Sequence, residues 1–380
     1  RYETNDPEET FRPKGDWLLN VFDETTKQDG YFRLEKLGSD PIKLIMEDRT
    51  FSYPTSTENS DRLLLTSETF EDPGDLYWSE GGFDDLKKLS QINPQQADIK
   101  WGTVELTKWR SNHGDELEGL IYKPEDFDPN KKYPMIVYFY ERYSNLLNNY
   151  WQPGPSRSIV NFSYLVSNDY IVFVPDIIYR DGYPGPSSYD CVVPGVQHMI
   201  DLGYVDPERI GVQGQSWGGY QTAYLVTQTD IFACGFAGAP VSNMTSAYGG
   251  IRWGSGLSRQ FQYERTQSRI GGSLWEYPER YIENSPVFFA DRVNTPLLIM
   301  HNDNDGAVPW YQGIEYFMAL RRNNKPTWML VYNNEAHNLR QWHNRMDLDK
   351  RMYQFFDHYL KGEPAPKWMT DGVPAKLKGK

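Results

Sequence analysis

The sequence has few cysteines, no long apolar run and no excess of positive charge. Its two cysteines, Cys191 and Cys234, cannot build a disulfide framework and match no zinc-site spacing, so we expect buried free thiols. No apolar run approaches the roughly 18 residues of a membrane span. The formal net charge of −13 argues against nucleic acid or an anionic membrane as the main partner. We therefore expect no membrane insertion and no nucleic-acid binding.

The composition is that of a folded chain with a large core. Hydrophobic residues make up 39% and aromatic residues 15% of the 380 positions, enough for two domains or one large one. The start, Arg1 to Thr4, resembles the middle of a protein, so we expect a fragment or a processed chain. Localisation stays open between the cytoplasm and the periplasm or cell exterior, and so does formation of a homo-oligomer.

Residues 1–100 contain short strand patterns separated by turns rich in Asp, Pro and Gly. The predicted strands are 31–37, 41–46, 61–68 and 75–78. This pattern favours an antiparallel meander such as a propeller blade, but it is too short for a closed propeller of about 4–8 blades. The polar stretch 79–100 predicts a domain boundary.

Residues 101–365 predict an α/β domain, followed by a tail over 366–380 that carries Lys376, Lys378 and Lys380. A hairpin (103–109 and 117–122) precedes alternating strands and helices, which favours a mostly parallel, doubly wound sheet with helices on both faces. The predicted strands are 135–140, 171–175, 210–213, 232–237, 296–301 and 327–332. The predicted helices are one ending at 168, 189–202 interrupted by Pro194, 219–227, 311–321 and 346–360. The aromatic-rich segment 242–291 is expected to be irregular and to cover a substrate.

One short stretch carries a chemical signature. Gly214-Gln215-Ser216-Trp217-Gly218 matches G-x-S-x-G between a predicted strand and a predicted helix, the setting of a nucleophilic serine on a strained turn. Side chains at Gly214 or Gly218 would collide with the adjoining strand or helix. The backbone N–H of Trp217 would then be available to an oxyanion. The match alone can arise by chance in a chain with 31 glycines.

A serine nucleophile needs a base and an acid, which in α/β-hydrolases follow it in the order Ser, Asp/Glu, His. Asp303 and Asp305 compete for the acid, and Asp305, further along the loop and just before Gly306, is preferred. His337 follows the last predicted strand directly, whereas His343 lies on the approach to the last helix. The order and spacing favour Ser216, Asp305 and His337.

A second oxyanion donor is expected in the loop after the strand 135–140. This loop lacks the glycine-rich pattern of lipases. A tyrosine hydroxyl can donate instead, which makes Tyr140 a candidate. On pattern alone, a core-packing role for Tyr140 is equally favoured.

Together these residues resemble the prolyl oligopeptidase family of serine peptidases, in particular the catalytic part of its dipeptidyl peptidases and acylaminoacyl peptidases. The resemblance covers residues 101–360. The matching motifs lie at 133–140, 179–185, 214–220, 239–243, 285–309 and 335–338. Several motifs in the family's order are far more specific than the serine motif alone.

The resemblance implies roles for individual residues. It makes Ser216 the nucleophile, Asp305 the acid and His337 the base. It makes the Tyr140 hydroxyl and the Trp217 amide the oxyanion hole, and it places the side chains of Trp217, Val241 and Val308 in the S1 pocket. It also implies that residues 1–100 are the last blade or two of a propeller, and that no metal or cofactor is required.

Three departures from the family bear on specificity. Tyr140 is followed by Glu141-Arg142-Tyr143 instead of Gly-Gly-Pro or Ala-Gly-Pro. Ala247 and Ile251 stand where the dipeptidyl peptidases have two tyrosines that grip proline, and Ala307 replaces an asparagine. The sequence therefore does not indicate a preference for proline at P1, and exopeptidase and endopeptidase activity both remain open.

These observations predict a serine peptidase that cleaves short peptides through an acyl-enzyme. Two alternatives stay open. The fold and triad also suit an esterase or acyl transferase, and a binding module with a silent site would keep the same fold.

Overall fold

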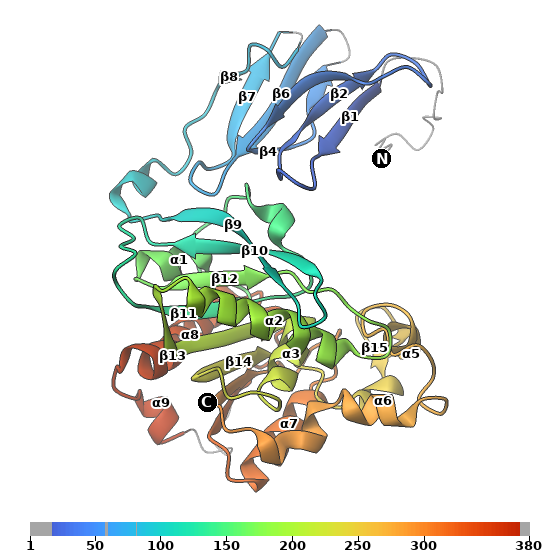
Figure 1. The fold of residues 1–380 in the computed structure, drawn as a ribbon, viewed down its shortest axis with the longest axis vertical. Helices are drawn as coiled ribbons and strands as arrows, with labels where there is room; N and C mark the ends of the chain where they lie inside the picture. The colour runs from blue at the N-terminus through green and yellow to red at the C-terminus, as the bar shows by residue number, and fades with distance from the viewer. Residues whose placement is uncertain (1–16, 58–59, 81, 373–380) are drawn as a thin grey trace. The chain divides into compact units, whose positions relative to one another are not determined.

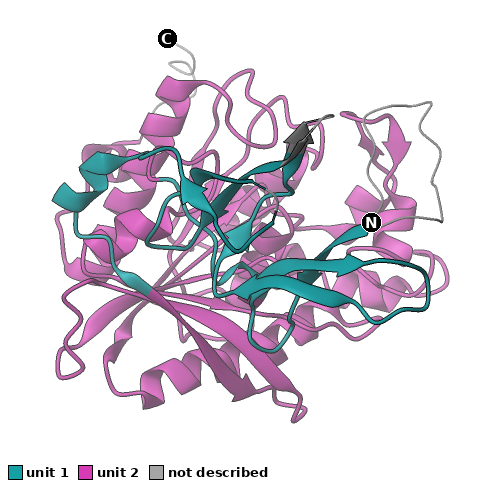
Figure 2. Cartoon of the chain, turned by 90° about the horizontal axis from the view of Figure 1, so that it is seen from above, with its two compact units in different colours: residues 1–103, 145–152 teal, residues 104–144, 153–380 magenta. Residues whose placement is uncertain are grey.

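The computed structural model describes residues 17–57, 60–80 and 82–372. The chain forms two compact units (Figure 2), one of residues 1–103 with 145–152 and one of residues 104–144 with 153–380. The lysines of the expected tail, Lys376, Lys378 and Lys380, lie outside the described residues. The two buried cysteines are free thiols, as predicted.

The first unit consists of small antiparallel sheets, which confirms the strands predicted in this region. One sheet has the order β1-β2-β3; in the other, β4-β6-β7-β8, β5 also pairs with β6. The elements are β1 (Trp17–Phe22), β2 (Asp29–Leu34), β3 (Ile42–Glu47), β4 (Thr50–Phe51), β5 (Thr55–Thr57), β6 (Ser60–Glu68), β7 (Asp75–Ser79), β8 (Lys87–Lys88) and the 3-10 helix η1 (Pro94–Asp98).

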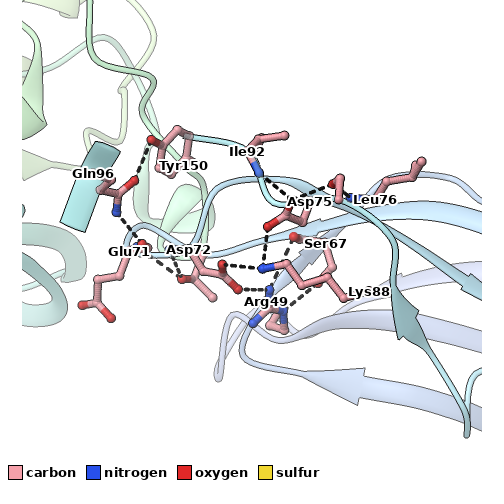
Figure 3. A network of polar contacts seen from close by, with 12 residues as sticks. Arg49, Ser67, Glu71, Asp72, Asp75, Leu76, Lys88, Ile92, Gln96 and Tyr150 are labelled. Atoms are coloured by element: carbon pink, nitrogen blue, oxygen red, sulfur yellow. Dashed lines mark hydrogen bonds and ion pairs between the residues drawn. The ribbon is translucent and has the colours of Figure 1, made fainter. Parts of the chain in front are cut away.

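A buried carboxylate anchors one end of the second sheet (Figure 3). Asp75 accepts hydrogen bonds from Ser90 at 2.6 Å and from the backbone N–H of Ile92 at 3.0 Å, and its other oxygen lies 2.5 Å from the Lys88 ammonium. Burial alone would raise the pKa of Asp75, but these partners hold it below its usual value. Nearby, Tyr150 donates to Gln96 at 2.8 Å, which ties the segment 145–152 to this unit.

The second unit is built on an eight-stranded sheet (Figure 1) with the order β18-β17-β14-β13-β11-β12-β10-β9. The neighbours from β12 to β18 pair in parallel, while β10 pairs antiparallel with β12. The mostly parallel α/β fold is therefore as predicted. The strands are β9 (Thr103–Arg110), β10 (Glu116–Lys123), β11 (Tyr133–Tyr138), β12 (Ile171–Pro175), β13 (Val205–Gln215), β14 (Cys234–Gly238), β17 (Leu297–Met300) and β18 (Thr327–Leu330).

Helices cover both faces of this sheet. On β13, a Cβ at Gly211 would contact Phe356 of α8, whereas the next residue, Val212, lies in one core cluster with Ala223 of α3. Successive strand residues point to opposite faces, so α8 and α3 lie on opposite sides. The helices are α1 (Phe162–Ser167), α2 (Pro184–Asp201), α3 (Trp217–Leu225), α7 (Tyr311–Arg322), α8 (Trp342–Lys361) and α9 (Lys367–Thr370), and the 3-10 helix η2 (Ser144–Leu146) follows β11.

Helix α2 corrects the prediction for its segment. The helix begins at Pro184, not Tyr189, and it continues through Pro194, which the sequence predicted as an interruption. A proline removes the N–H that would bind the carbonyl four residues earlier. Here that carbonyl, on Asp190, accepts the backbone N–H of Asn112 at 3.0 Å. The helix continues because the carbonyl that Pro194 leaves without a helical donor has another partner.

The segment 242–291, between β14 and β17, is more regular than predicted. It contains short helices and a two-stranded hairpin, which Figure 1 shows beyond the end of the sheet near α3. Its elements are α4 (Met244–Tyr248), β15 (Ile251–Arg252), β16 (Leu257–Ser258), α5 (Gln260–Glu264), α6 (Pro278–Glu283) and the 3-10 helix η3 (Pro286–Arg292).

In the part of the chain that the structure describes, no helix is both long enough and apolar enough to cross a bilayer.

Candidate active site

Ser216 occupies the tight turn between β13 and α3. Its φ of 60° and ψ of −113° lie outside the regions that L-residues favour, a backbone conformation that costs about 1–3 kcal/mol. Its N–H donates to the carbonyl of Gly238, the last residue of β14, at 2.8 Å. The turn is therefore held in a strained conformation by the neighbouring strand.

The two glycines of the motif allow the close approach that the sequence predicted. A Cβ at Gly214 would collide with the backbone of Gly218, and a Cβ at Gly218 would collide with the carbonyl of Phe139 on the neighbouring loop. Any side chain at these positions would force the strand and helix apart. The local sequence thus dictates both the turn and the exposure of the serine at the carboxyl edge of the sheet.

The predicted acid and base are in contact. Asp305 follows β17 and His337 follows β18, and Nδ1 of His337 lies 2.6 Å from Oδ2 of Asp305. An ionised carboxylate only accepts hydrogen bonds, so the proton on this imidazole resides on Nδ1. Nε2 is then the nitrogen with a lone pair, which is the arrangement that a general base requires.

Asp305 is buried and held by several donors. Its Oδ1 accepts the backbone N–H groups of Ala307 at 2.8 Å and Val308 at 2.9 Å. Nε2 of the buried His301 lies 3.4 Å from Oδ2 and also donates to the Val308 carbonyl at 3.1 Å. Burial alone would raise the pKa of Asp305, but the hydrogen bonds from His301 and His337 outweigh it and hold the pKa below its usual value. The carboxylate therefore stays ionised.

The loop that carries His337 has supports that the sequence did not reveal. Asn302 donates through its side chain to the carbonyl of Ala336 at 2.7 Å, and Gln215, the residue before the serine, donates to the carbonyl of His337 at 3.0 Å. The buried Glu335 accepts the backbone N–H groups of Arg340 and Gln341, just before α8. All three residues lie within the motif positions 214–220, 285–309 and 335–338, but no sequence pattern assigns their contacts.

Asp303 and His343, the other candidates for the acid and the base, lie elsewhere and make different contacts. Asp303 accepts the backbone N–H of Asn334 at 2.7 Å, which links the two loops. His343 lies inside the first turn of α8, not on the approach to it. The structure thus joins Asp305 to His337, and it gives Asp303 a purely structural contact.

Ser216 lines a pocket of about 730 Å³ in the second unit, together with Tyr140. The Tyr140 hydroxyl accepts a hydrogen bond from Nε2 of Gln267 at 2.9 Å. Because Gln267 supplies its own proton to this contact, the hydroxyl proton of Tyr140 remains available for donation into the pocket. Gln267, in the segment 242–291, carried no recognisable sequence signal.

Trp217 is the first residue of α3, where backbone N–H groups have no partner within the helix. Its indole nitrogen donates to the hydroxyl of Tyr179 at 2.9 Å, and its ring stacks on Tyr220 with centroids 4.5 Å apart. Val241 and Val308 are buried in the same cluster as Trp217, against which Tyr140 packs. The S1 roles of Trp217, Val241 and Val308 stay predictions.

Among the described residues, no group of three or more His, Cys, Asp or Glu side chains is arranged to hold a metal ion.

Residues 155–363 match the model of the prolyl oligopeptidase family. The chain belongs to this family. The matched residues begin after the Tyr140 loop. They include the Ser216 turn and both loops that carry Asp305 and His337.

Curated relatives and solved structures agree with this assignment. The chain is 26% identical over 292 residues to a dipeptidyl-peptidase 5 of Porphyromonas endodontalis, a match covering 72% of this chain and 39% of that protein. It is 24% identical over 236 residues to an acylamino-acid-releasing enzyme of Rattus norvegicus, covering 59% and 31%. The chain therefore spans less than half the length of these prolyl oligopeptidase relatives.

The fold is shared with a Pyrococcus horikoshii acylaminoacyl peptidase. The TM-score is 0.75 at 20% sequence identity, and the match covers 95% of this chain and 56% of that one. The described strands and helices are thus those of a prolyl oligopeptidase-family α/β-hydrolase.

Proposed function

We propose that this chain is a serine peptidase that hydrolyses short peptides through an acyl-enzyme. The single observation that carries the proposal is the 2.6 Å hydrogen bond between His337 and the buried Asp305. The two residues lie on loops after the neighbouring strands β18 and β17, in the same sheet as β13, the strand that precedes Ser216. We assign residues 101–365 to the catalytic domain and residues 1–100 to the last blade or two of a propeller.

In the first half-reaction, Nε2 of His337 takes the proton of the Ser216 hydroxyl as its oxygen attacks the scissile carbonyl. Asp305 keeps Nδ1 protonated and stabilises the imidazolium that forms. The Trp217 amide and the Tyr140 hydroxyl donate to the oxyanion of the tetrahedral intermediate. The imidazolium then protonates the leaving amine, which gives the acyl-enzyme and a free amino terminus.

Deacylation repeats these steps with water. His337 takes a proton from the water molecule that attacks the Ser216 ester. Collapse of the second tetrahedral intermediate releases the carboxylic acid and returns the proton to Ser216. The side chains of Trp217, Val241 and Val308 would contact the P1 residue in this proposal.

A substrate panel tests the proposal. The chain and its Ser216→Ala variant are assayed on dipeptide fluorogenic amides and on matched chromogenic esters. We expect amide turnover by the chain and none by the variant, at a nearly unchanged Tm. Ester turnover without any amide cleavage would contradict the peptidase assignment and favour an esterase.

A further inference from the structure

The pocket in front of Ser216 is rich in arginine. Its lining includes Arg252, Arg265 and Arg269 and one carboxylate, that of Glu141. Three positive charges and one negative charge leave a formal charge of +2, in a chain whose own net charge is −13. Cations gathered in a cleft of an acidic protein attract anionic ligands. This local reversal of sign therefore calls for a functional explanation.

Arg269 is already neutralised. Its guanidinium nitrogens lie 3.2 and 3.3 Å from the two carboxylate oxygens of Glu141, a two-pronged pair. The same guanidinium lies over the ring of Tyr179 at 4.5 Å and donates to the carbonyl of Gln267 at 2.6 Å. Arg269 thus fixes the pocket wall and contributes little charge to a ligand.

Arg252 and Arg265 are different. Within the described residues neither guanidinium has a carboxylate within 4.0 Å, whereas Arg269 has one. The hydrogen bonds from Ser273 are the main cause of the lowered pKa of Glu276, and the charge of Arg265 contributes less to it. Glu264, which precedes Arg265, accepts the hydroxyl of Tyr248 at 2.6 Å. The two arginines therefore carry charge that no ion pair with a described residue offsets.

The pocket is large enough for part of a peptide. A volume of about 730 Å³ corresponds to an edge of roughly 9 Å, and an extended chain advances roughly 3.3–3.6 Å per residue. Two to three residues therefore fit beside Ser216. A planar guanidinium matches the geometry of a carboxylate, and the other lining side chains near the two arginines include the neutral Gln262 and Thr266.

We propose that Arg252 and Arg265 select peptides with a carboxylate within two or three residues of the cleaved bond, supplied by an acidic side chain or by the peptide's own carboxyl terminus. This inference rests on the proposed function, since it assigns the substrate class of the same site. Peptides with Lys or Arg at the same positions are disfavoured, because like charges repel in a pocket of this sign.

Binding to the inactive variant separates this inference from catalysis. The full chain with Ser216→Ala is titrated with fluorescent tetrapeptides of alanine that carry glutamate or glutamine at one position, each with a free or an amidated carboxyl terminus. We expect the fully neutral peptide to bind about tenfold more weakly than the charged ones, the effect of losing one charge-assisted hydrogen bond. Added salt should reduce the difference.

Comparison of the four peptides identifies which carboxylate the pocket binds. If amidation causes the loss, the site reads the terminal carboxylate; if exchange of glutamate for glutamine causes it, the site reads an acidic side chain. Equal affinity for all four peptides at low salt would overturn the inference. Failure of the proposed function would look different, because a chain without a reactive serine could still show the charge preference.

Arginine variants connect the preference to the named residues. Arg252→Gln and Arg265→Gln should each weaken binding of the charged peptide about tenfold and leave the neutral peptide unaffected, while Arg252→Lys retains part of the preference. Arg322→Gln, at an exposed position on α7, is the matched control and should bind as the parent does. An unchanged preference in both Gln variants, with Tm also unchanged, would contradict the assignment.

Discussion

Nδ1 of His337 lies 2.6 Å from Oδ2 of Asp305, and this contact joins two loops that are 32 residues apart in the chain. The carboxylate is buried, and backbone N–H groups and His301 occupy the rest of its acceptor sites. This geometry fixes the tautomer of the imidazole before any substrate is present.

Asp305→Asn should lower kcat about 10³–10⁴-fold. The amide can present its NH2 group to Nδ1 and so stabilise the wrong imidazole tautomer, which removes the base from Nε2. Steady-state kinetics on a peptide amide measure the loss. Asp303→Asn is the matched control, since an amide oxygen can still accept the Asn334 N–H, and it should retain most activity. Equal losses in both variants would contradict the assignment of Asp305.

Tyr140→Phe should lower kcat about 10²–10³-fold, the range for removing one oxyanion donor. Its hydroxyl accepts from Gln267 and has its own proton to give, so the deletion removes a donor and leaves the ring in place. Tyr311→Phe, at an exposed position on α7, serves as the control. A loss of less than a few-fold in Tyr140→Phe would make this residue a packing element only.

Gly214→Ala should destabilise the second unit by about 1–3 kcal/mol and abolish turnover, because the added methyl group collides with the backbone of Gly218. Gly249→Ala is the matched control. A Cβ at Gly249 meets no heavy atom within 4 Å, and its φ of −79° suits alanine. Thermal unfolding of the two variants makes the comparison. A normal Tm and normal activity in Gly214→Ala would contradict the close approach seen at the turn.

Asp349 in α8 should make stability depend on pH. Burial raises the pKa of its carboxyl from 3.8 to about 7, against a backbone N–H donated by Ser156 at 3.0 Å and the more distant charge of Arg345. The folded chain thus keeps this proton up to about pH 7, whereas the unfolded chain loses it near pH 4. Stability therefore falls as the pH rises through this window.

Asp349→Asn removes this buried charge. Its Tm should match that of the parent near pH 4 and exceed it increasingly up to pH 8. The corresponding gain in the free energy of unfolding has a limit of about 4 kcal/mol, because the pKa shift is about three units. Asp291→Asn, at an exposed position, should show no such trend. A constant difference between Asp349→Asn and the parent from pH 4 to pH 8 would contradict the raised pKa.

The sequence predicted the parts of the fold that local patterns encode. Continuous apolar runs gave the buried strands, and the motif around Ser216 gave the turn because Gly214 and Gly218 are needed there for steric reasons. The chain order of nucleophile, acid and base in α/β-hydrolases, applied to the loops after the last two predicted strands, led to Asp305 and His337. Each of these signals lies within a few residues of the position that it predicts.

The rest depended on contacts between distant residues. Pro194 looked like a break because its effect depends on whether another donor, here Asn112, reaches the carbonyl of Asp190. Gln267 lies 127 residues from the Tyr140 that it contacts. The arginine-lined pocket, likewise, arises only when residues of 242–291 fold over Ser216. No local pattern carries such information.

The most direct test of the central claim, that Ser216 is a nucleophile activated by His337 and Asp305, is labelling with a fluorophosphonate followed by peptide mapping. We predict a single modified residue, Ser216, with labelling lost in Ser216→Ala and strongly slowed in His337→Ala. An unlabelled chain with a normal Tm, or a label that maps to another serine, would contradict the account.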